Sequence, residues 1–338
     1  MTEKLLVTGA SGFIGTHCIL ELLNNGYHVR GTVRKLDRSE QIRAILKNHT
    51  KNTDRLEFTQ AELTDPGNWE EVMPGCSCVL HIASPVPIIQ PKNADEVIIP
   101  AREGALNVLK AAKKQGVSRV VMTSSVAAVF GKGREGSRVY SELDWTDTDD
   151  PDQSPYSLSK TFAEKAAWEF VEEQGAPELV VINPSVVFGP ALESDYGSSL
   201  EIIYKLLKGK YPMVPKLGFE IVDVRDVAVL HRLAYESPEA PGRRFLCSSG
   251  FRWLKEMSIF LRENFPEYRK KIPVREMPNL LLKIISIFDR SVASFVPYLE
   301  VKKEVDFSPA HKVLGWQPRS PEESIEAGAR SLIELGIV

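Results

Sequence analysis

A tyrosine and a lysine four residues apart are the side chains of this sequence best suited to acid–base chemistry. Tyr156 and Lys160 lie in the segment YSLSK, and residues at i and i+4 share one face of a helix. The pKa of a free phenol is ~10, but a nearby ammonium group stabilises the phenolate and lowers that pKa. The spacing predicts a tyrosine that exchanges a proton with a substrate, assisted by the lysine. The alternative is an exposed pair on a helix surface, so the prediction depends on the other motifs of the sequence.

Two serines are candidates to polarise a carbonyl oxygen beside that pair. Ser124 and Ser125 follow the apolar run Arg119–Thr123, and ligands bind beyond the carboxyl ends of strands in parallel sheets. We favour Ser125, because Ser124 is nearer the strand and is expected to hydrogen-bond the backbone. His81 is an alternative base, but its position inside an apolar strand favours a buried structural histidine.

A glycine-rich segment near the start of the chain predicts a dinucleotide site. Residues 8–15, the glycine loop, read TGASGFIG and lie between an apolar run and a helical pattern. Gly9 permits a tight turn, Gly12 lets the backbone approach a pyrophosphate, and Gly15 lets the helix pack closely. The first helical turn then offers free N–H groups to the phosphates. A glycine-rich turn that binds no ligand is the alternative.

The residues after the second and third apolar runs bear on the choice of dinucleotide. An NAD site usually places Asp or Glu ~20 residues after the loop, against the ribose 2′-hydroxyl. This chain has Arg34 and Lys35 there, and two cations suit a 2′-phosphate, so NADP(H) is favoured over NAD. A solvated basic strand end is the alternative. Glu62 and Leu63 are candidates to flank the adenine, although Glu62 could equally be a surface carboxylate.

The elements that must position these residues alternate along the first half of the chain. Apolar runs predict six strands, and long helical patterns lie between them, notably over 95–115 and 155–174. This alternation predicts an α/β fold with a Rossmann-type, doubly wound parallel sheet. The predicted strands are Lys4–Thr8, Tyr27–Val33, Leu56–Gln60, Cys78–Ala83, Arg119–Thr123 and Leu179–Asn183.

Beyond about Gly189 the pattern changes, and prolines and aromatic residues become frequent. We expect residues 1–189 to form the NADP-binding domain and 190–338 to form a smaller, mostly helical portion that binds the substrate, with 219–246 a candidate to return to the sheet. Helices are predicted over 200–207, 225–235, 253–264 and 321–335. An apolar substrate pocket is expected between the two parts. Its candidate lining residues, each of which could equally belong to the core, are Val86, Val126, Phe130, Tyr204 and Met213.

Composition excludes several classes of function. The 338 residues are 43% hydrophobic and 26% charged, and the net charge of −3 does not indicate binding to nucleic acid or to an anionic membrane. No signal peptide is expected, because the first residues, MTEKLLVTGASG, show no basic region followed by an apolar stretch and a cleavage site. No membrane span is expected, because the most apolar late stretch, Pro278–Leu299, contains three charged residues. Four cysteines and six histidines show no metal-binding spacing. We therefore expect free thiols, no metal site and a cytoplasmic location.

Taken together, the motifs resemble the extended short-chain dehydrogenase/reductase family, and within it the dihydroflavonol 4-reductase-like branch of aldehyde and ketone reductases. The resemblance runs nearly from end to end. It is carried by VTGASGFIG (7–15), VRGTVR (29–34), HIASP (81–85), PAREGALNVLKAA (100–112), VVMTSSVAAVFG (120–131), YSLSK (156–160), INPSVVFGP (182–190), VDVRDVA (222–228) and LGWQPRSPEESI (314–325).

The resemblance implies a role for each matching residue. Tyr156 is then the acid–base, Lys160 binds the nicotinamide ribose and lowers the tyrosine pKa, and Ser125 holds the carbonyl. Arg34 binds the 2′-phosphate. The remaining contacts to the cofactor fall on Ser11, Phe13 and Ile14 at the phosphates, Ile82, Ala83 and Ser84 at the ribose, Pro184 and Val187 at the nicotinamide, and Ser199 at a phosphate.

The chain departs from the family pattern in two places. Plant relatives usually have Asp-Leu where this chain has Glu62-Leu63, and the N-W-Y-C-Y signature of cinnamoyl-CoA reductases is replaced by DQSPYSLSK. The second departure argues against a CoA-thioester substrate.

The sequence therefore predicts an NADPH-dependent reductase of an aldehyde or ketone, acting on a small-molecule substrate as a monomer or homodimer. The alternatives are a nucleotide-sugar epimerase or dehydratase with bound NAD, and a dinucleotide sensor without catalysis. The motifs do not define the substrate or the stereochemistry.

Overall fold

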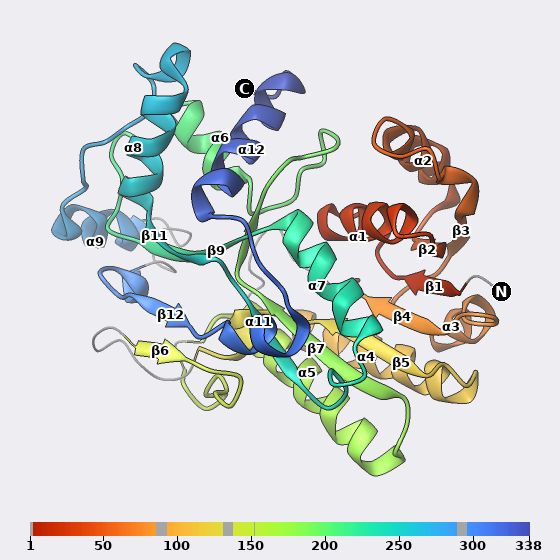
Figure 1. The fold of residues 1–338 in the computed structure, drawn as a ribbon. Coiled ribbons are helices and arrows are strands. Elements are labelled where there is room, and N and C mark those ends of the chain that lie inside the picture. The colour runs from red at the N-terminus through yellow and green to blue at the C-terminus, as the bar shows by residue number, and fades with distance from the viewer. Residues whose placement is uncertain (1–2, 86–92, 131–137, 152, 289–295) are drawn as a thin grey trace.

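The computed structural model describes residues 3–85, 93–130, 138–151, 153–288 and 296–338, and seven parallel strands form its central sheet (Figure 1). The strand order is β10-β7-β5-β4-β1-β2-β3, so the chain starts inside the sheet and extends it in both directions. This is the doubly wound α/β architecture that the alternation predicted. The strands are β1 (Lys4–Val7), β2 (His28–Val33), β3 (Leu56–Gln60), β4 (Cys78–His81), β5 (Arg119–Thr123), β7 (Glu178–Pro184) and β10 (Arg244–Cys247).

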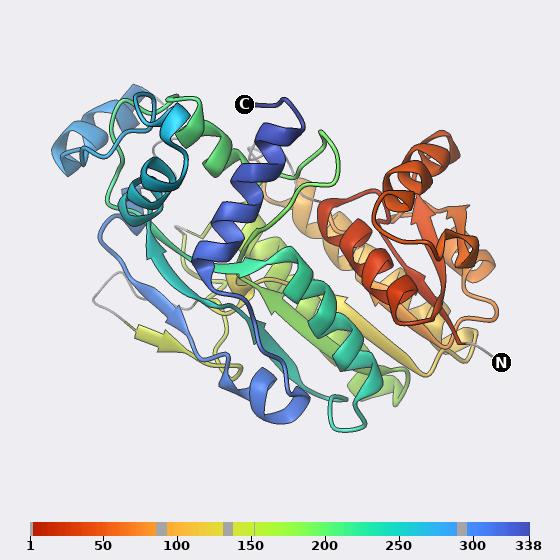
Figure 2. The same ribbon diagram turned by 45° about the horizontal axis from the view of Figure 1, so that its top comes forward.

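Different helices bury the two faces of this sheet. On one face α1 (Phe13–Asn24) packs against α7 (Val224–Glu236), and on the other α4 (Asp95–Lys114) packs against α5 (Pro155–Gln174) (Figures 1 and 2). Side chains of β1 alternate between the two cores: Leu5 lies in the core under α1, whereas Leu6 lies in the core under α4 and α5. Because both faces are covered, the strands are near-continuous apolar runs.

Helix α5, which carries two of the predicted catalytic residues, has clear signals at both ends. The Ser154 hydroxyl accepts a hydrogen bond from the N–H of Ser157, and Pro155 occupies the first turn. Gly175 ends the helix at a φ of 67°, in the left-handed region that favours glycine. These signals fix the helix at the predicted bounds.

The second half of the chain adds two small sheets that the sequence patterns did not predict. β8 (Val186–Phe188), β9 (Gly218–Asp223) and β11 (Gly250–Trp253) form one, and β12 (Lys303–Val305) pairs in parallel with β6 (Arg138–Tyr140). Strands this short give no clear periodic pattern. The chain also returns to the main sheet through β10, which pairs with β7.

Helices of the second half pack around the three-stranded sheet and build a separate core with it. They begin and end within about a residue of the predicted bounds: α6 (Glu201–Leu207), α8 (Leu254–Asn264) and α12 (Pro321–Glu334). The remaining α-helices of the described ranges are α2 (Ser39–Lys47), α3 (Pro66–Val72), α9 (Asn279–Phe288) and α11 (Ser308–Leu314).

The thiols and the apolar helices match two expectations. Cys18, Cys76, Cys78 and Cys247 are all buried and unbridged, as predicted. Within the described ranges, no helix is both long enough and apolar enough to span a bilayer. The late apolar stretch contains α9, a helix of 10 residues.

Candidate active site

Two of the three predicted catalytic residues meet at the carboxyl edge of the sheet. Ser125 is the second residue after β5 and has extended conformation, and Tyr156 lies in the first turn of α5. The Ser125 side chain lies close enough to Tyr156 to lower the pKa of its phenol, and the Ser125 hydroxyl oxygen accepts the N–H of Ala127 at 3.1 Å. The hydroxyl and the phenol are therefore close enough to contact the same substrate oxygen.

The protonation behaviour of Tyr156 differs from the expectation. Burial raises the pKa of Tyr156, and the hydrogen bond from Ser125 opposes that rise without cancelling it. The Lys160 ammonium points elsewhere: its Nζ lies 3.4 Å from the carbonyl oxygen of Thr123. Lys160 is therefore not among the groups that shift the pKa of the protonated Tyr156 here, because the ammonium donates to the end of β5 and burial dominates at the phenol.

Lys160 is itself strongly perturbed. Its side chain is buried, and burial lowers the pKa of Lys160 from 10.5 to about 8, while the negative charge of Glu164 opposes that fall. A lysine with its pKa in this range carries its charge at neutral pH and loses it under mildly basic conditions.

The geometry is consistent with the choice of Ser125 over Ser124. It does not agree with one reason for that choice, the expected hydrogen bond from Ser124 to the backbone. The Ser124 N–H donates to the carbonyl oxygen of Ile182 at 2.7 Å. Its hydroxyl is buried and, among the described residues, has no hydrogen-bond partner. The expectation that the Ser124 side chain bonds the backbone is wrong, because only its main chain does so.

His81 is the buried structural histidine that the sequence favoured. Its Nδ1 lies 3.0 Å from the hydroxyl of Thr8, and that hydroxyl also accepts the N–H groups of Ile82 and Ala83 at 3.0 and 2.9 Å. Since the Thr8 oxygen accepts these two N–H groups, its own proton is donated to Nδ1 of His81. Burial lowers the pKa of His81 to about 3, so the ring is neutral. Thr8, which the sequence analysis gave no role, thus fixes two of the predicted ribose-side residues.

The glycine loop has the close packing that its pattern predicts. Gly9 adopts a φ of +69°, and a Cβ there would lie 3.1 Å from the Cα of Ala83. A Cβ on Gly15 would lie 2.2 Å from the carbonyl oxygen of Gly9, which no L side chain tolerates. The loop is held to β2 by hydrogen bonds from the N–H groups of Gly9 and Ala10 to the hydroxyl and carbonyl of Thr32, at 3.3 and 3.0 Å.

The remaining residues predicted near the adenosine end lie at the ends of β2 and β3. Arg34 and Lys35 follow β2 directly and are exposed. Glu62 is also exposed, and its carboxylate accepts the N–H of Leu63 at 3.0 Å. The Leu63 side chain lies against Gly104 of α4, where a Cβ would be 2.4 Å from its Cγ. Leu63 is therefore fixed in place, whereas Glu62 is a surface carboxylate beside it.

The segment after β8 lies against the start of α1. The ring Nε2 of His17 lies 2.9 Å from the Pro190 carbonyl oxygen, and Gly197 packs on Phe13, with 3.2 Å from its Cβ position to that of Phe13. This arrangement brings residues 190–199, Ser199 among them, to the side of the sheet that carries the glycine loop. Pro184 ends β7 and Val187 lies in β8, both buried.

An ion pair adds a further link between residues 190–199 and the residues that follow β2. Arg38 Nη2 lies 3.0 Å from the Glu193 carboxylate. Arg38 was not singled out in the sequence, although a cation four residues beyond Arg34 would have been the signal. The pair joins the segment after β8 to the short 3-10 helix that follows β2.

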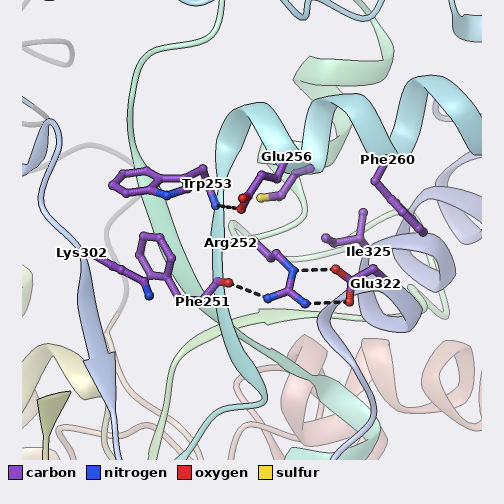
Figure 3. Close-up of a pocket in the computed structure, with 9 residues that line it drawn as sticks. Phe251, Arg252, Trp253, Glu256, Phe260, Lys302, Glu322 and Ile325 are labelled. Carbon is purple, nitrogen blue, oxygen red and sulfur yellow. Dashed lines mark hydrogen bonds and ion pairs between the residues drawn. The ribbon is translucent and has the colours of Figure 1, made fainter. Parts of the chain in front are cut away.

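The described cavity in Figure 3, of about 400 Å³, is not the predicted cleft. It lies between β11, α8 and α12, and none of its lining residues was singled out in the sequence. Its charged side chains pair with each other or with neighbours: Arg252 with Glu322 at 2.5 Å, and Lys302 with Glu304 at 2.8 Å. The lining residues are Phe251, Arg252, Trp253, Glu256, Met257, Phe260, Lys302, Glu322 and Ile325.

Of the residues suggested for the substrate pocket, some lie in a core and others are partly exposed. Val126 is buried in a small core with Tyr140 and Leu246, and Phe130 packs on it at the edge of that core. Tyr204 and Met213 are partly exposed. Val86 lies outside the described residues.

The site fits the group that its motifs imply. The loop backbone packs so closely at Gly9 and Gly15 that no Cβ fits there, and among the described residues no side chain caps the first turn of α1. Its N–H groups are thus available to a phosphate, and exposed cations follow the neighbouring strand. A phosphorylated dinucleotide matches this combination of backbone donors and positive charge.

Comparison with known proteins places the chain among reductases of this fold. Residues 5–247 match the model of the NAD dependent epimerase/dehydratase family. Cinnamoyl-CoA reductase 1 of Arabidopsis thaliana is 38% identical over 337 residues, 99% of this chain and 90% of that protein. The bifunctional dihydroflavonol 4-reductase/flavanone 4-reductase of Malus domestica is 34% identical over 79% of this chain and 78% of its own length.

A solved structure agrees with the same assignment. The yeast methylglyoxal/isovaleraldehyde reductase in complex with NADPH matches with a TM-score of 0.81 at 28% identity, over 99% of this chain and 100% of that one. The fold, the motifs and the relatives agree with one another. The chain therefore belongs to the NAD dependent epimerase/dehydratase family of extended short-chain dehydrogenases/reductases.

Proposed function

We propose that the protein is an NADPH-dependent carbonyl reductase in which Tyr156 protonates the substrate oxygen. The observation that carries this proposal is the placement of Ser125, just after β5, beside Tyr156, in the first turn of α5, at the sheet edge that also carries the glycine loop. A hydroxyl that binds the carbonyl oxygen and a phenol that protonates it must reach the same atom, and the placement of this pair supports that role.

The chain's own groups account for the proton side of the reaction. When bound, NADPH supplies the hydride that reduces the carbonyl carbon. Ser125 orients the carbonyl oxygen, and Tyr156 donates its proton to that oxygen, which gives the alcohol. Burial raises the pKa of Tyr156, so the phenol carries its proton at neutral pH. Lys160 lies one helical turn further along α5, where a cation stabilises the phenolate that proton transfer leaves behind.

The cofactor contacts follow from the same placement. The glycine loop and the first turn of α1 bind the pyrophosphate, and Arg34 with Lys35 binds the 2′-phosphate. Ile82, Ala83 and Ser84 line the ribose side. Support comes from the yeast relative in complex with NADPH, and from the exposed cations after β2. Glu62, Pro184, Val187 and Ser199 complete the proposed contacts.

The substrate is an aldehyde or ketone with aromatic or hydrophobic character. The relatives' names cover a cinnamoyl-CoA, a dihydroflavonol and methylglyoxal. The sequence DQSPYSLSK before and within α5 replaces the cinnamoyl-CoA reductase signature, so a free carbonyl compound is preferred to a CoA thioester. Four unbridged, buried thiols suit a reducing compartment, and we place the protein in the cytoplasm.

The direct test measures NADPH consumption with aromatic and aliphatic aldehydes and ketones, repeated with NADH and with Tyr156→Phe. We expect turnover with NADPH that the substitution abolishes. A variant as active as the parent would refute the role of Tyr156. Inertness towards every carbonyl, with tightly bound NAD in the purified protein, would favour an epimerase or dehydratase. Tight NADPH binding without turnover would favour a sensor.

A further inference from the structure

A buried acid lies directly behind the catalytic residues. Glu164 follows Lys160 by one turn of α5, and its side chain is completely buried. Its Oε1 lies 2.5 Å from the Nε of Arg244 in β10, whose side chain is also buried. A buried ion pair costs more to desolvate than an exposed pair, and apolar residues of the same size often give equal stability. Stability alone is therefore a weak explanation for this carboxylate.

An amide connects the carboxylate to the predicted catalytic serine. Nδ2 of Asn183, in β7, donates to Oε2 of Glu164 at 2.9 Å and to the carbonyl oxygen of Ser125 at 3.2 Å. Asn183 is completely buried. Both amide hydrogens are then used, so the Ser125 main chain is tied to Glu164 through a single side chain. Loss of the carboxylate would release one end of this link.

Arg244 is held independently of Glu164. Its guanidinium stacks over the Trp145 ring, with 3.8 Å from Cζ to the ring centroid. Its Nη1 donates to the carbonyl oxygens of Glu142 and Asp144 at 2.8 and 2.9 Å. The cation is therefore fixed from the other side, and it anchors the carboxylate in place.

The groups around Lys160 leave Glu164 as its counter-charge. The Lys160 ammonium faces His81 of β4, which is neutral, and the Thr123 carbonyl of β5. Tyr156, on the same helix, carries its proton and is also neutral. His231 of α7, which bonds the Thr123 hydroxyl at 2.7 Å, is also neutral, since burial lowers its pKa to about 4. Among the groups that shift the pKa of Lys160, as far as the described residues go, Glu164 supplies the negative charge.

We propose that Glu164 is a positioning residue of the catalytic centre, which keeps Lys160 in its cationic form and fixes Ser125 through Asn183. The proposal rests on the proposed carbonyl reductase function. Its physical basis is that a buried ammonium group loses its proton readily unless a negative charge lies nearby. Burial already lowers the pKa of Lys160 to about 8, and Glu164 opposes that fall.

The closing experiment separates charge from shape and does not depend on turnover. The protein is labelled with [ε-13C]lysine, and the Lys160 signal is identified by its absence in Lys160→Arg. NMR titrations then compare the parent with Glu164→Gln, which keeps the shape, and Glu164→Asp, which keeps the charge. Glu172→Gln is the matched control, because it removes an exposed acid from the same helix.

We expect the Lys160 titration midpoint to fall by at least one pH unit in Glu164→Gln and to stay near the parent value in Glu164→Asp and Glu172→Gln. The basic limb of the pH profile of kcat/KM moves with it. An unchanged midpoint in Glu164→Gln would overturn the proposal even if the protein is an active reductase. A shifted midpoint without carbonyl turnover would instead leave the pairing intact and refute the reductase function.

A second variant guards against misfolding of the first. Glu164→Gln leaves Arg244 without its anion, whereas Glu164→Gln combined with Arg244→Met removes both buried charges together. The double variant should lower the Lys160 midpoint in the same direction. A midpoint at or above the parent value in a folded double variant would also overturn the proposal.

Discussion

The glycine loop and the catalytic centre of Ser125, Tyr156 and Lys160 lie at the same edge of the sheet but are built in opposite ways. The loop is contiguous, and its geometry comes from the backbone of residues 8–15, packed so closely that single added atoms collide. The catalytic centre collects side chains from α5 and from the residues just after β5, with support from β7 and β10. Substitutions in the loop are therefore expected to impair cofactor binding through steric clashes. Substitutions in the catalytic centre are expected to impair the reaction by removing a charge or a transferable proton.

The largest effect is expected at the centre, from Tyr156→Phe. Loss of a general acid lowers kcat by about 10³-fold, whereas the affinity for NADPH, measured by fluorescence titration, should stay within about two-fold of the parent because the loop is untouched. Tyr235→Phe, which removes a phenol from α7, serves as the control. A large loss of NADPH binding in Tyr156→Phe would show that the two regions are not separable.

In the glycine loop, the substitution expected to have a large effect is Gly15→Ala, which acts through a steric clash. The new methyl would lie 2.2 Å from the Gly9 carbonyl oxygen, which is backbone and cannot rotate away. We expect NADPH affinity to fall about 100-fold, or about 3 kcal/mol by the usual conversion, together with a lower melting temperature.

A matched glycine outside the loop tests whether this clash is specific. A Cβ on Gly218 in β9 would lie 2.0 Å from the Phe251 ring, which is a side chain and can turn. Gly218→Ala should cost about 1–3 kcal/mol of stability and leave NADPH affinity unchanged. Equal loss of binding in both variants would contradict a role of the loop in binding the cofactor.

Charge at the edge of the loop region gives a smaller effect. Arg34→Ala removes an exposed cation after β2, and loss of a charge-assisted hydrogen bond costs about 2 kcal/mol. NADPH affinity should fall about 30-fold while NADH affinity stays the same. Lys47→Ala, which removes an exposed cation from α2, should change neither the NADPH affinity nor the NADH affinity. Equal losses for both cofactors in Arg34→Ala would remove the assignment of the 2′-phosphate site.

The smallest effect tests a charge buried far from both regions, at Glu220 in β9. It accepts hydrogen bonds from the Ser248 hydroxyl and the Val305 N–H, and burial raises its pKa from 4.5 to about 7. A raised acid pKa means that the folded state holds the proton more tightly. The free energy of unfolding therefore falls as pH rises through about 4.5 to 7, by about 1 kcal/mol between pH 6 and pH 8.

Glu220→Gln should remove that part of the pH dependence. Urea unfolding at pH 6 and pH 8 measures it as the difference between the variant and the parent, with Glu239→Gln, at an exposed acid, as the control. The same slope in Glu220→Gln and the parent would show that Glu220 does not titrate in this range.

Much of the first half of the fold was predictable, because its signals are local. Strands buried on both faces are apolar runs, and helix ends carry signals such as Ser154 and Gly175. The short strands β6, β8, β11 and β12 were not predictable, since each is three or four residues long and depends on a distant partner.

The site divides in the same way. The glycine loop could be identified from spacing alone, because its function requires the absence of side chains. The direction of the Tyr156 pKa could not, since burial and the orientation of the Lys160 ammonium depend on β5 and its neighbours. Glu164 and Asn183 were missed for the same reason: neither becomes significant until β7 and α5 lie side by side.

The two helical layers on the sheet have a consequence for synthesis of the chain on the ribosome. The core under α4 and α5 is built from residues between Leu6 and Val181, so this layer can pack as soon as β7 has emerged. The opposite core needs α7 and then Leu314 and Trp316, which are made near the end of translation. Since folding during synthesis proceeds from the N-terminus, the nascent protein passes through a stage with one finished face and one exposed apolar face, when protection by a chaperone matters most.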